Sequence, residues 1–326
     1  IWFLSLFTAG NRFEANILLL SLAGGGCVFL IWLIFKRISM DENSAVLFAS
    51  LLGLSASHLV FATVIETYIF SAFCLLLFIW LMLAEKSTGL IATAGMAFGI
   101  TITNILQQGL IHLLVQRNLK RTIILFGTAT LLGIGLNVFC RFLYPVTEYV
   151  FLPQNLSGEQ KFQKEISLQR VQLIVEDLLI YNVAAPQPYV DTRNQTLRFN
   201  FLSGTIREYV WFGWPSLVLW TLSMVLAIIH FFKHPHLDST GTRMGIAVLV
   251  CLLFNFILHM GYGAEPFLYS ADWTYALIFF VAISLGTLAE KKWFQVFLFT
   301  LVGSVFVNNM WLLYLIARKT SEHLGS

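Results

Sequence analysis

Apolar runs of about 20 residues recur along most of the chain, and each is long enough for a helix to cross the hydrocarbon core of a bilayer. Short polar turns separate these runs. The pattern predicts an all-α, polytopic transmembrane helix bundle of about nine or ten spans or half-spans. The expected spans are 16–36, 45–62, 67–84, 89–104, 122–141, 209–232, 244–262, 272–289 and 293–316.

One segment between these runs is short and more polar. Residues 105–116 contain Gln107, Gln108 and His112 and predict a half-helix or a re-entrant piece, which protein or water must cover at membrane depth. The chain begins at Ile1 inside an apolar stretch. We therefore expect residues 1–10 to be the remainder of an earlier helix or an interfacial segment, with the natural N-terminus missing.

A long polar insert, residues 142–208, interrupts the single transmembrane domain expected for 1–326. Between Glu159 and Tyr181 its apolar residues recur at helical spacing with charged residues between them. This pattern predicts an amphipathic helix that lies on the membrane surface or caps the bundle. Pro186 and Pro188 then indicate a loop before the chain re-enters the bilayer.

Composition supports a membrane location. Only 11% of the residues are charged, 58% are hydrophobic, and mean hydropathy is +0.78. A soluble domain carries about 25% charged residues. The net charge of +3 is small and scattered, so we expect no nucleic-acid partner. The four cysteines have no paired spacing and are predicted to be buried small hydrophobes, and no metal site is expected from them. They are Cys27, Cys74, Cys140 and Cys251.

Lysine and arginine in short loops predict the orientation. With 105–116 counted as a crossing, ten basic residues fall on the predicted cytoplasmic side: Lys36, Arg37, Lys86, Arg117, Lys120, Arg121, Lys233, Arg243, Lys291 and Lys292. Three fall opposite, outside the insert: Arg12, Arg318 and Lys319. The insert is then extracytoplasmic, facing the periplasm or the cell exterior. A bacterial cytoplasmic (inner) membrane is the expected location.

Polar residues at the outer helix ends are the candidate site, because polar groups at membrane depth are costly. We expect them to form one pocket beside the insert. The candidates are Arg12, Glu14, His58, Glu66, Tyr68, Asn104, Gln107, Gln108, Arg207, His259, Glu265, Tyr269 and Asp272. Each also has a structural interpretation, such as a solvated interfacial pair for Arg12 and Glu14 or a packed helix residue for His58. Sequence motifs of soluble enzymes are absent.

Three short stretches, 11–37, 57–68 and 99–104, carry a family resemblance. The first has an Arg followed by Asn-Ile-Leu-Leu-Leu-Ser and ends at Lys36-Arg37, the second contains Glu66-Thr-Tyr68, and the third is small and polar. Together they resemble the GT-C superfamily of polytopic membrane glycosyltransferases, which includes protein O-mannosyltransferase-like and aminoarabinose-transferase-like proteins.

The resemblance implies transfer of a sugar from a polyprenyl-phosphate donor to a lipid, glycan or protein acceptor at the outer face. It places the catalytic carboxylate in a loop that would precede residue 1, so the catalytic residue is unknown. Membrane lipids and the lipid-linked donor are the expected partners, other membrane subunits are further candidates, and a divalent metal is left open as a cofactor. Two alternatives remain: a non-catalytic integral membrane subunit of a larger complex, and a transporter or flippase.

Overall fold

Long apolar runs form the helices that the sequence predicts. The computed structural model describes residues 2–149, 152, 160–191, 198–200, 208–233 and 240–324. The long helices are α2 (Arg12–Arg37), α8 (Leu119–Leu143), α10 (Trp214–Lys233), α11 (Thr240–Gly261), α12 (Ala271–Ala289) and α13 (Lys292–Leu324). Six helices in the described part are long and apolar enough to cross a membrane. The protein is therefore an all-α polytopic integral membrane protein.

Shorter helices complete the bundle. They are α1 (Trp2–Ser5), α3 (Glu42–Leu54), α4 (Ala56–Phe61), α5 (Tyr68–Leu83), α6 (Ser87–Ile100) and α7 (Ile102–Gln116), with one 3₁₀ turn at Leu6–Thr8. The segment predicted to be a half-helix is α7, a continuous helix of 15 residues. Its polar side chains do not interrupt it, because neighbouring helices provide hydrogen-bond partners for Gln107 and Gln108.

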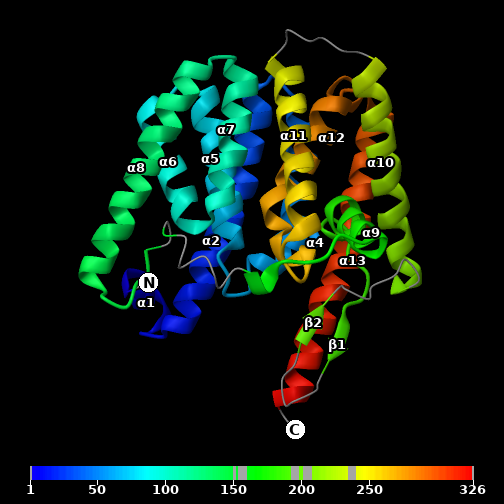
Figure 1. Cartoon of the computed structure of the whole chain (residues 1–326). Coiled ribbons are helices and arrows are strands. Elements are labelled where there is room, and N and C mark those ends of the chain that lie inside the picture. Colours follow the sequence, from blue (N-terminus) through cyan, green and yellow to red (C-terminus); the bar gives the residue numbers. More distant parts are fainter. Residues whose placement is uncertain are drawn as a thin grey trace.

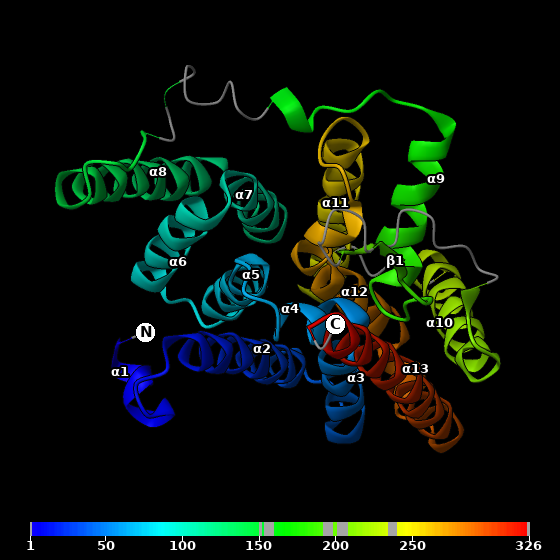
Figure 2. The same cartoon turned by 90° about the horizontal axis from the view of Figure 1, so that it is seen from below.

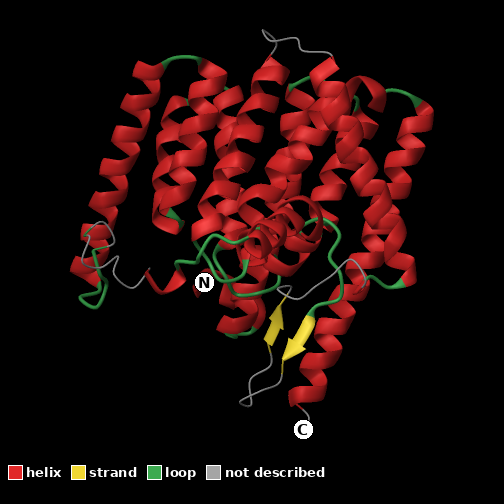
Figure 3. Ribbon diagram, turned by 45° about the vertical axis from the view of Figure 1, so that its right-hand side comes forward, coloured by secondary structure: helices red, strands yellow, loops and turns green. Residues whose placement is uncertain are grey.

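The chain crosses the bundle back and forth, so its loops collect at two ends (Figures 1 and 3). The α2–α3, α5–α6, α7–α8 and α12–α13 connections lie at the upper end in Figure 1, together with the end of α10 and the start of α11. These are the helix ends predicted to be basic. The insert lies at the lower end, where α13 projects beyond the bundle. The sidedness of the two sets of loops thus agrees with the predicted topology, while the compartment that each end faces stays a prediction.

Helix α12 lies in the middle of the bundle and α8 at its edge. Nearly every residue of α12 is buried, as expected for a helix that is apolar on all sides. Seen from the insert end, α8 lies outside α6 and α7 (Figure 2). Leu131 is 72% exposed and Phe142 is 81% exposed. In a bilayer these side chains face lipid.

Small residues allow α2 to approach its neighbours. A Cβ atom at Gly24 would lie 2.9 Å from Ala62 Cβ, and one at Gly26 would lie 2.7 Å from Phe73 Cε2. Nothing lies within 4 Å of the corresponding position at Gly25. The Gly24–Gly26 run is therefore a close helix contact, as its position within an apolar helix predicts.

The insert begins after α8 and contains α9 (Leu168–Glu176), a π-helical turn η3 (Asp177–Tyr181) and an antiparallel hairpin of β1 (Tyr189–Asp191) and β2 (Arg198–Asn200). The amphipathic helix predicted between Glu159 and Tyr181 is shorter than that span, because Ser167 caps it: its Oγ accepts a hydrogen bond from Arg170 N at 3.2 Å. Of the two predicted placements, the helix takes the one that caps the bundle, since Arg170 and Ile174 are buried against α11.

Backbone and side-chain hydrogen bonds join the insert to the bundle at membrane depth. The span predicted at 45–62 is broken at Ser55, between α3 and α4. The free amides at the start of α4 are satisfied by the insert: Ala56 N donates to Val183 O at 3.1 Å and Ser57 N to Asn182 O at 2.9 Å.

Helices α10 and α13 hold the same part of the insert from the other side. Asn309 Nδ2 of α13 donates to Leu54 O and to Val183 O, at 2.7 Å each. Trp220 Nε1 of α10 donates to Leu179 O at 2.7 Å. The described part of the insert is consequently an anchored cap over this end of the bundle.

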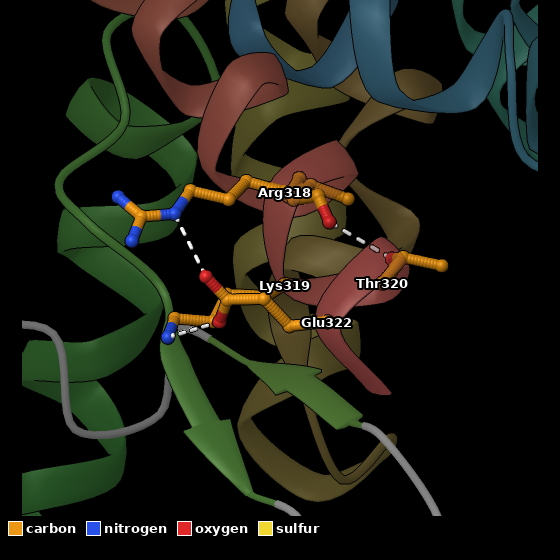
Figure 4. A network of polar contacts seen from close by, with 5 residues as sticks. Arg318, Lys319, Thr320 and Glu322 are labelled. Carbon is orange, nitrogen blue, oxygen red and sulfur yellow. Dashed lines mark hydrogen bonds and ion pairs between the residues drawn. The ribbon is translucent and has the colours of Figure 1, made fainter. Parts of the chain in front are cut away.

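The protruding end of α13 is polar. Arg318 Nε and Lys319 Nζ each lie 2.8 Å from a different oxygen of Glu322, and Thr320 Oγ1 donates to Ile316 O (Figure 4). All three charged side chains are more than 40% exposed. Such solvated ion pairs add little stability, about 0.5 kcal/mol each, but they suit a helix end that leaves the bilayer.

Candidate functional site

A cavity of about 680 Å³ lies at the insert end of the bundle. It is bounded by the start of α5, the α6–α7 turn, the end of α11, the 3₁₀ turn η7 (Pro266–Tyr269) with the start of α12, and the insert. Its lining is Thr67, Tyr68, residues 98–103, Glu148, Phe162, Asn255, Leu258, His259, Tyr262, Tyr269 and Asp272. The volume is within the usual range of small-molecule sites, about 300–1,000 Å³.

Asp272 is the buried carboxylate of this cavity. It stands in the first turn of α12 and is 4% exposed. Its Oδ1 accepts a hydrogen bond from Asn104 Nδ2 at 3.3 Å, and the same amide donates to Ser71 Oγ at 2.7 Å. Asn104 comes from the start of α7 and Ser71 from α5. Three helices thus fix the position of one carboxylate at the cavity wall.

Amide side chains continue this network from Asn104 to Asn255, which also lines the cavity. Gln107 Nε2 donates to Asn104 Oδ1 at 3.0 Å, and Asn255 Nδ2 of α11 donates to Gln107 Oε1 at 3.0 Å. All of these residues are at most 2% exposed. A satisfied polar network in an apolar bundle holds its members rigidly, because breaking any bond leaves a buried polar group unpaired.

Aromatic rings form another part of the lining. Tyr68, Tyr262 and Tyr269 lie in a row: the ring centroids of Tyr68 and Tyr269 are 5.5 Å apart and those of Tyr262 and Tyr269 are 6.1 Å apart. His259 packs on Tyr269 at 4.6 Å, and Phe162 of the insert packs on Tyr262 at 6.0 Å. These contacts make a continuous aromatic wall from α5 to the insert.

Arg170 attaches the insert to the loop that carries this wall. Its guanidinium donates to the backbone oxygens of His259, Tyr262, Gly263 and Ala264, at distances from 2.5 to 3.1 Å. Those carbonyls follow the last turn of α11, where helical acceptors have no partner within the helix. The side chain therefore caps α11, and its positive charge suits the negative end of the helix dipole.

Backbone hydrogen bonds also connect the insert to the loop that follows α11. Lys164 N donates to Gly261 O at 3.0 Å, and Gly263 N donates to Phe162 O at 2.9 Å. Gly263 has φ +86°, a conformation that favours glycine. The insert thus sets the path of the loop between α11 and η7.

Asp177, the residue directly after α9, is fully buried, and neither of its carboxylate oxygens has a hydrogen-bonding side-chain partner. Burial raises the pKa of Asp177 well above its ordinary value, and the nearby Glu265 charge raises it further. Burial also lowers the pKa of Arg170, although a guanidinium stays protonated at neutral pH. The insert junction therefore favours a protonated Asp177.

Six of the predicted site residues meet at the cavity. Tyr68, His259, Tyr269 and Asp272 line it, and Asn104 and Gln107 stand directly behind Asp272. They come from four helices and the turn η7, which the predicted topology brings to the same end. Glu66 lies at that end too, in the turn before α5, but its side chain is exposed and outside the lining.

The other predicted residues lie elsewhere. Arg12 and Glu14 are exposed at the start of α2, where Glu14 Oε1 accepts from Asn11 Nδ2 at 2.9 Å. His58 Nε2 lies 3.0 Å from Gly24 O, inside the α2–α4 contact. Gln108 Nε2 donates to Cys74 O at 3.4 Å in the α5–α7 contact. Glu265 is half-buried beside Asp177, and Arg207 lies outside the described residues.

Sequence reasoning missed Arg170, Glu148, Phe162, Asn255 and Tyr262. Arg170 did carry a signal, because it falls on the same helical face as Ile174 and Leu178, four and eight residues later. A charge on an apolar face indicates a buried, bonded group. Glu148 and Phe162 lie in an irregular segment, where no periodicity relates a residue to its neighbours in space.

Metal binding is not indicated in the part of the chain that the structure describes, where no group of three or more His, Cys, Asp or Glu side chains could hold an ion. The four cysteines are free, three buried and Cys140 exposed.

Comparison with family models, with curated proteins and with solved structures gave no match.

Proposed function

We propose that this protein is a membrane transferase that moves a sugar from a polyprenyl-phosphate donor to a lipid, glycan or protein acceptor at the insert end of the bundle. The observation that carries the proposal is the cavity of about 680 Å³, which combines the buried carboxylate of Asp272 with the row of Tyr68, Tyr262 and Tyr269. Apolar pockets with a few fixed polar groups are the usual form of small-molecule sites.

Asp272 is our candidate for the general base. Its carboxylate would accept the proton of the acceptor hydroxyl while the hydroxyl oxygen bonds to the anomeric carbon and the sugar–phosphate bond breaks. The lipid phosphate leaves with the electron pair, and direct displacement inverts the anomeric carbon. Asn104 holds the carboxylate in place through its bond to Oδ1. The tyrosine row offers flat apolar faces against which a sugar ring can stack.

The lining also indicates how a lipid-linked donor would lie. No lysine or arginine lines the cavity among the described residues, so the phosphate is expected to stay at the mouth, with only the sugar inside. The α6–α7 turn forms one wall, and Met96 and Leu106 on these two helices are 53% and 54% exposed. The polyprenyl chain can then remain in lipid beside α6 and α7.

The test is transfer from a panel of polyprenyl-phosphate sugars by the protein in lipid nanodiscs, followed as loss of the labelled lipid-linked donor. Asp272→Asn keeps the size of the side chain and its bond to Asn104, and it should lower the rate by about 10²–10⁴-fold. Glu85→Gln removes one exposed carboxylate at the other end of the bundle and should leave the rate unchanged. Transfer by Asp272→Asn at the wild-type rate would refute the role of Asp272, and no transfer from any donor would refute the function.

A further inference from the structure

Among the described residues, every Asp, Glu, Lys or Arg side chain that lines the cavity is acidic. Two carboxylates line it, Asp272 from α12 and Glu148 from the segment after α8, while lysine and arginine are missing from the lining within the described residues. Neither carboxylate takes part in an ion pair in that part of the chain. Glu148 is exposed, whereas Asp272 is only 4% exposed. The described lining therefore holds two carboxyl groups and no lysine or arginine.

A buried carboxylate without a counter-charge is costly in a low-dielectric environment. The amide of Asn104 supplies one hydrogen bond to Asp272 but no charge. A cationic ligand would supply that charge, and its attraction would be strong because the surrounding helices exclude water. The electrostatics of the lining consequently favour a cation over a phosphate or a carboxylate.

The aromatic wall favours the same kind of ligand. Tyr68, Tyr262 and Tyr269 all line the cavity and are mutually tilted, with interplanar angles of 77° between Tyr68 and Tyr269 and 55° between Tyr262 and Tyr269. The faces of such rings attract ammonium groups within about 6 Å, and aromatic cages are the usual sites for methylated ammonium ions. Phe98 and Phe162 add apolar surface for the carbon skeleton of the ligand.

We propose that the cavity binds an ammonium group, primary or quaternary, on the part of the substrate that enters it. The group would lie against the tyrosine row, with Asp272 on its buried side and Glu148 toward the mouth. The inference rests on the proposed function only in taking this cavity as the substrate site; the charge argument does not depend on the transfer reaction.

A bare divalent cation fits the lining less well. Magnesium and calcium prefer six or more oxygen ligands in a tight shell. The lining offers two carboxylates from separate elements, and the described residues include no group suited to a metal ion. Tyrosine faces contribute nothing to such a shell, whereas they stabilise an organic cation.

The experiment is isothermal titration of the purified protein in a neutral maltoside detergent, which contains no amine. The probes are choline, ethanolamine and the neutral isostere of choline, in which a tert-butyl group replaces the trimethylammonium. At least one amine should bind about tenfold or more tightly than the isostere. Asp272→Asn should weaken that binding about tenfold and Glu148→Gln less, because Glu148 is solvated. Tyr269→Phe should bind nearly as well as wild type, and Tyr269→Leu should bind less tightly.

Glu85→Gln is the matched control, since it removes the same charge at the other end of the bundle and should leave the dissociation constant unchanged. Binding of both choline and ethanolamine no tighter than that of the isostere would overturn the inference, as would wild-type binding by both carboxylate variants. Tighter binding of inorganic phosphate than of either amine would also overturn it. Titration involves no turnover, so amine binding without transfer would overturn only the proposed function, and transfer without amine binding would overturn only the ammonium site.

Discussion

Replacing Arg170 with alanine should detach the insert from the end of α11. The guanidinium serves four backbone carbonyls, and those of His259 and Gly263 are bonded to it in buried positions. Water can reach the half-buried Tyr262 and the exposed Ala264 once the side chain is removed. Each buried acceptor left without a donor costs about 1–3 kcal/mol, so the docked insert should lose about 2–6 kcal/mol.

A loss of this size is a large fraction of the stability of a typical domain, so the local opening should be easy to detect. Hydrogen exchange followed by mass spectrometry should show faster exchange in 160–176 and 259–264 of Arg170→Ala, with the centre of α12 unchanged. Arg170→Lys should be intermediate, because an ammonium group cannot span four carbonyls as a planar guanidinium does.

Arg318→Ala is the matched control for this measurement. It removes an exposed arginine whose ion pair with Glu322 is worth about 0.5 kcal/mol or less, and it should not change exchange in the insert. Wild-type exchange of 160–176 in Arg170→Ala would show that the main-chain pairing at Phe162 and Lys164 holds the insert without the arginine. That result would refute the capping role assigned to Arg170.

Three further predictions concern the insert and the helix contacts. Docking of 168–181 on the bundle should weaken as pH rises above the ordinary aspartate range, because docking raises the pKa of Asp177 and the docked form therefore binds one more proton. Protection of this segment from proteases should consequently fall with rising pH in the wild type but not in Asp177→Asn. Asn309→Leu should lower the unfolding temperature in detergent, at a cost of about 2–4 kcal/mol, since Leu54 O loses its donor and Ala185 N loses its acceptor; a change under 0.5 kcal/mol would contradict this. Gly26→Val should destabilise the bundle by about 1–3 kcal/mol by the same assay, whereas Gly25→Ala should not, and equal effects would refute the close contact.

Some of the predicted site residues lie at one end of the bundle because helix ends alternate between its two faces. Once the spans were assigned, Tyr68, His259 and Asp272 had to lie at the same end as the insert. Their meeting at one cavity depended on packing, which a hydropathy pattern does not encode. Arg12 and Glu14 satisfy the same topological rule, yet they remain exposed at the start of α2.

The sequence pattern also did not show which helices are continuous and which are broken. Residues 105–116 have polar side chains that are costly in lipid, and the sequence alone predicted a half-helix there. The structure shows α7 intact, since Asn104, Asn255 and the backbone of Cys74 bond to its glutamines. The span predicted at 45–62 is instead broken at Ser55, where Val183 and Asn182 of the insert supply the missing backbone bonds.

The order of apolar runs and polar turns determined that the chain forms a helical membrane bundle with one long insert, and which helix ends share a face. This follows from local physics, because each span must satisfy its own backbone and hide its polar groups from lipid. Tertiary structure decided which polar residues meet, that Arg170 caps α11, and that Asp272 and Glu148 face one cavity. Those outcomes depend on contacts between residues more than 80 positions apart, and only the packed helices bring such residues together.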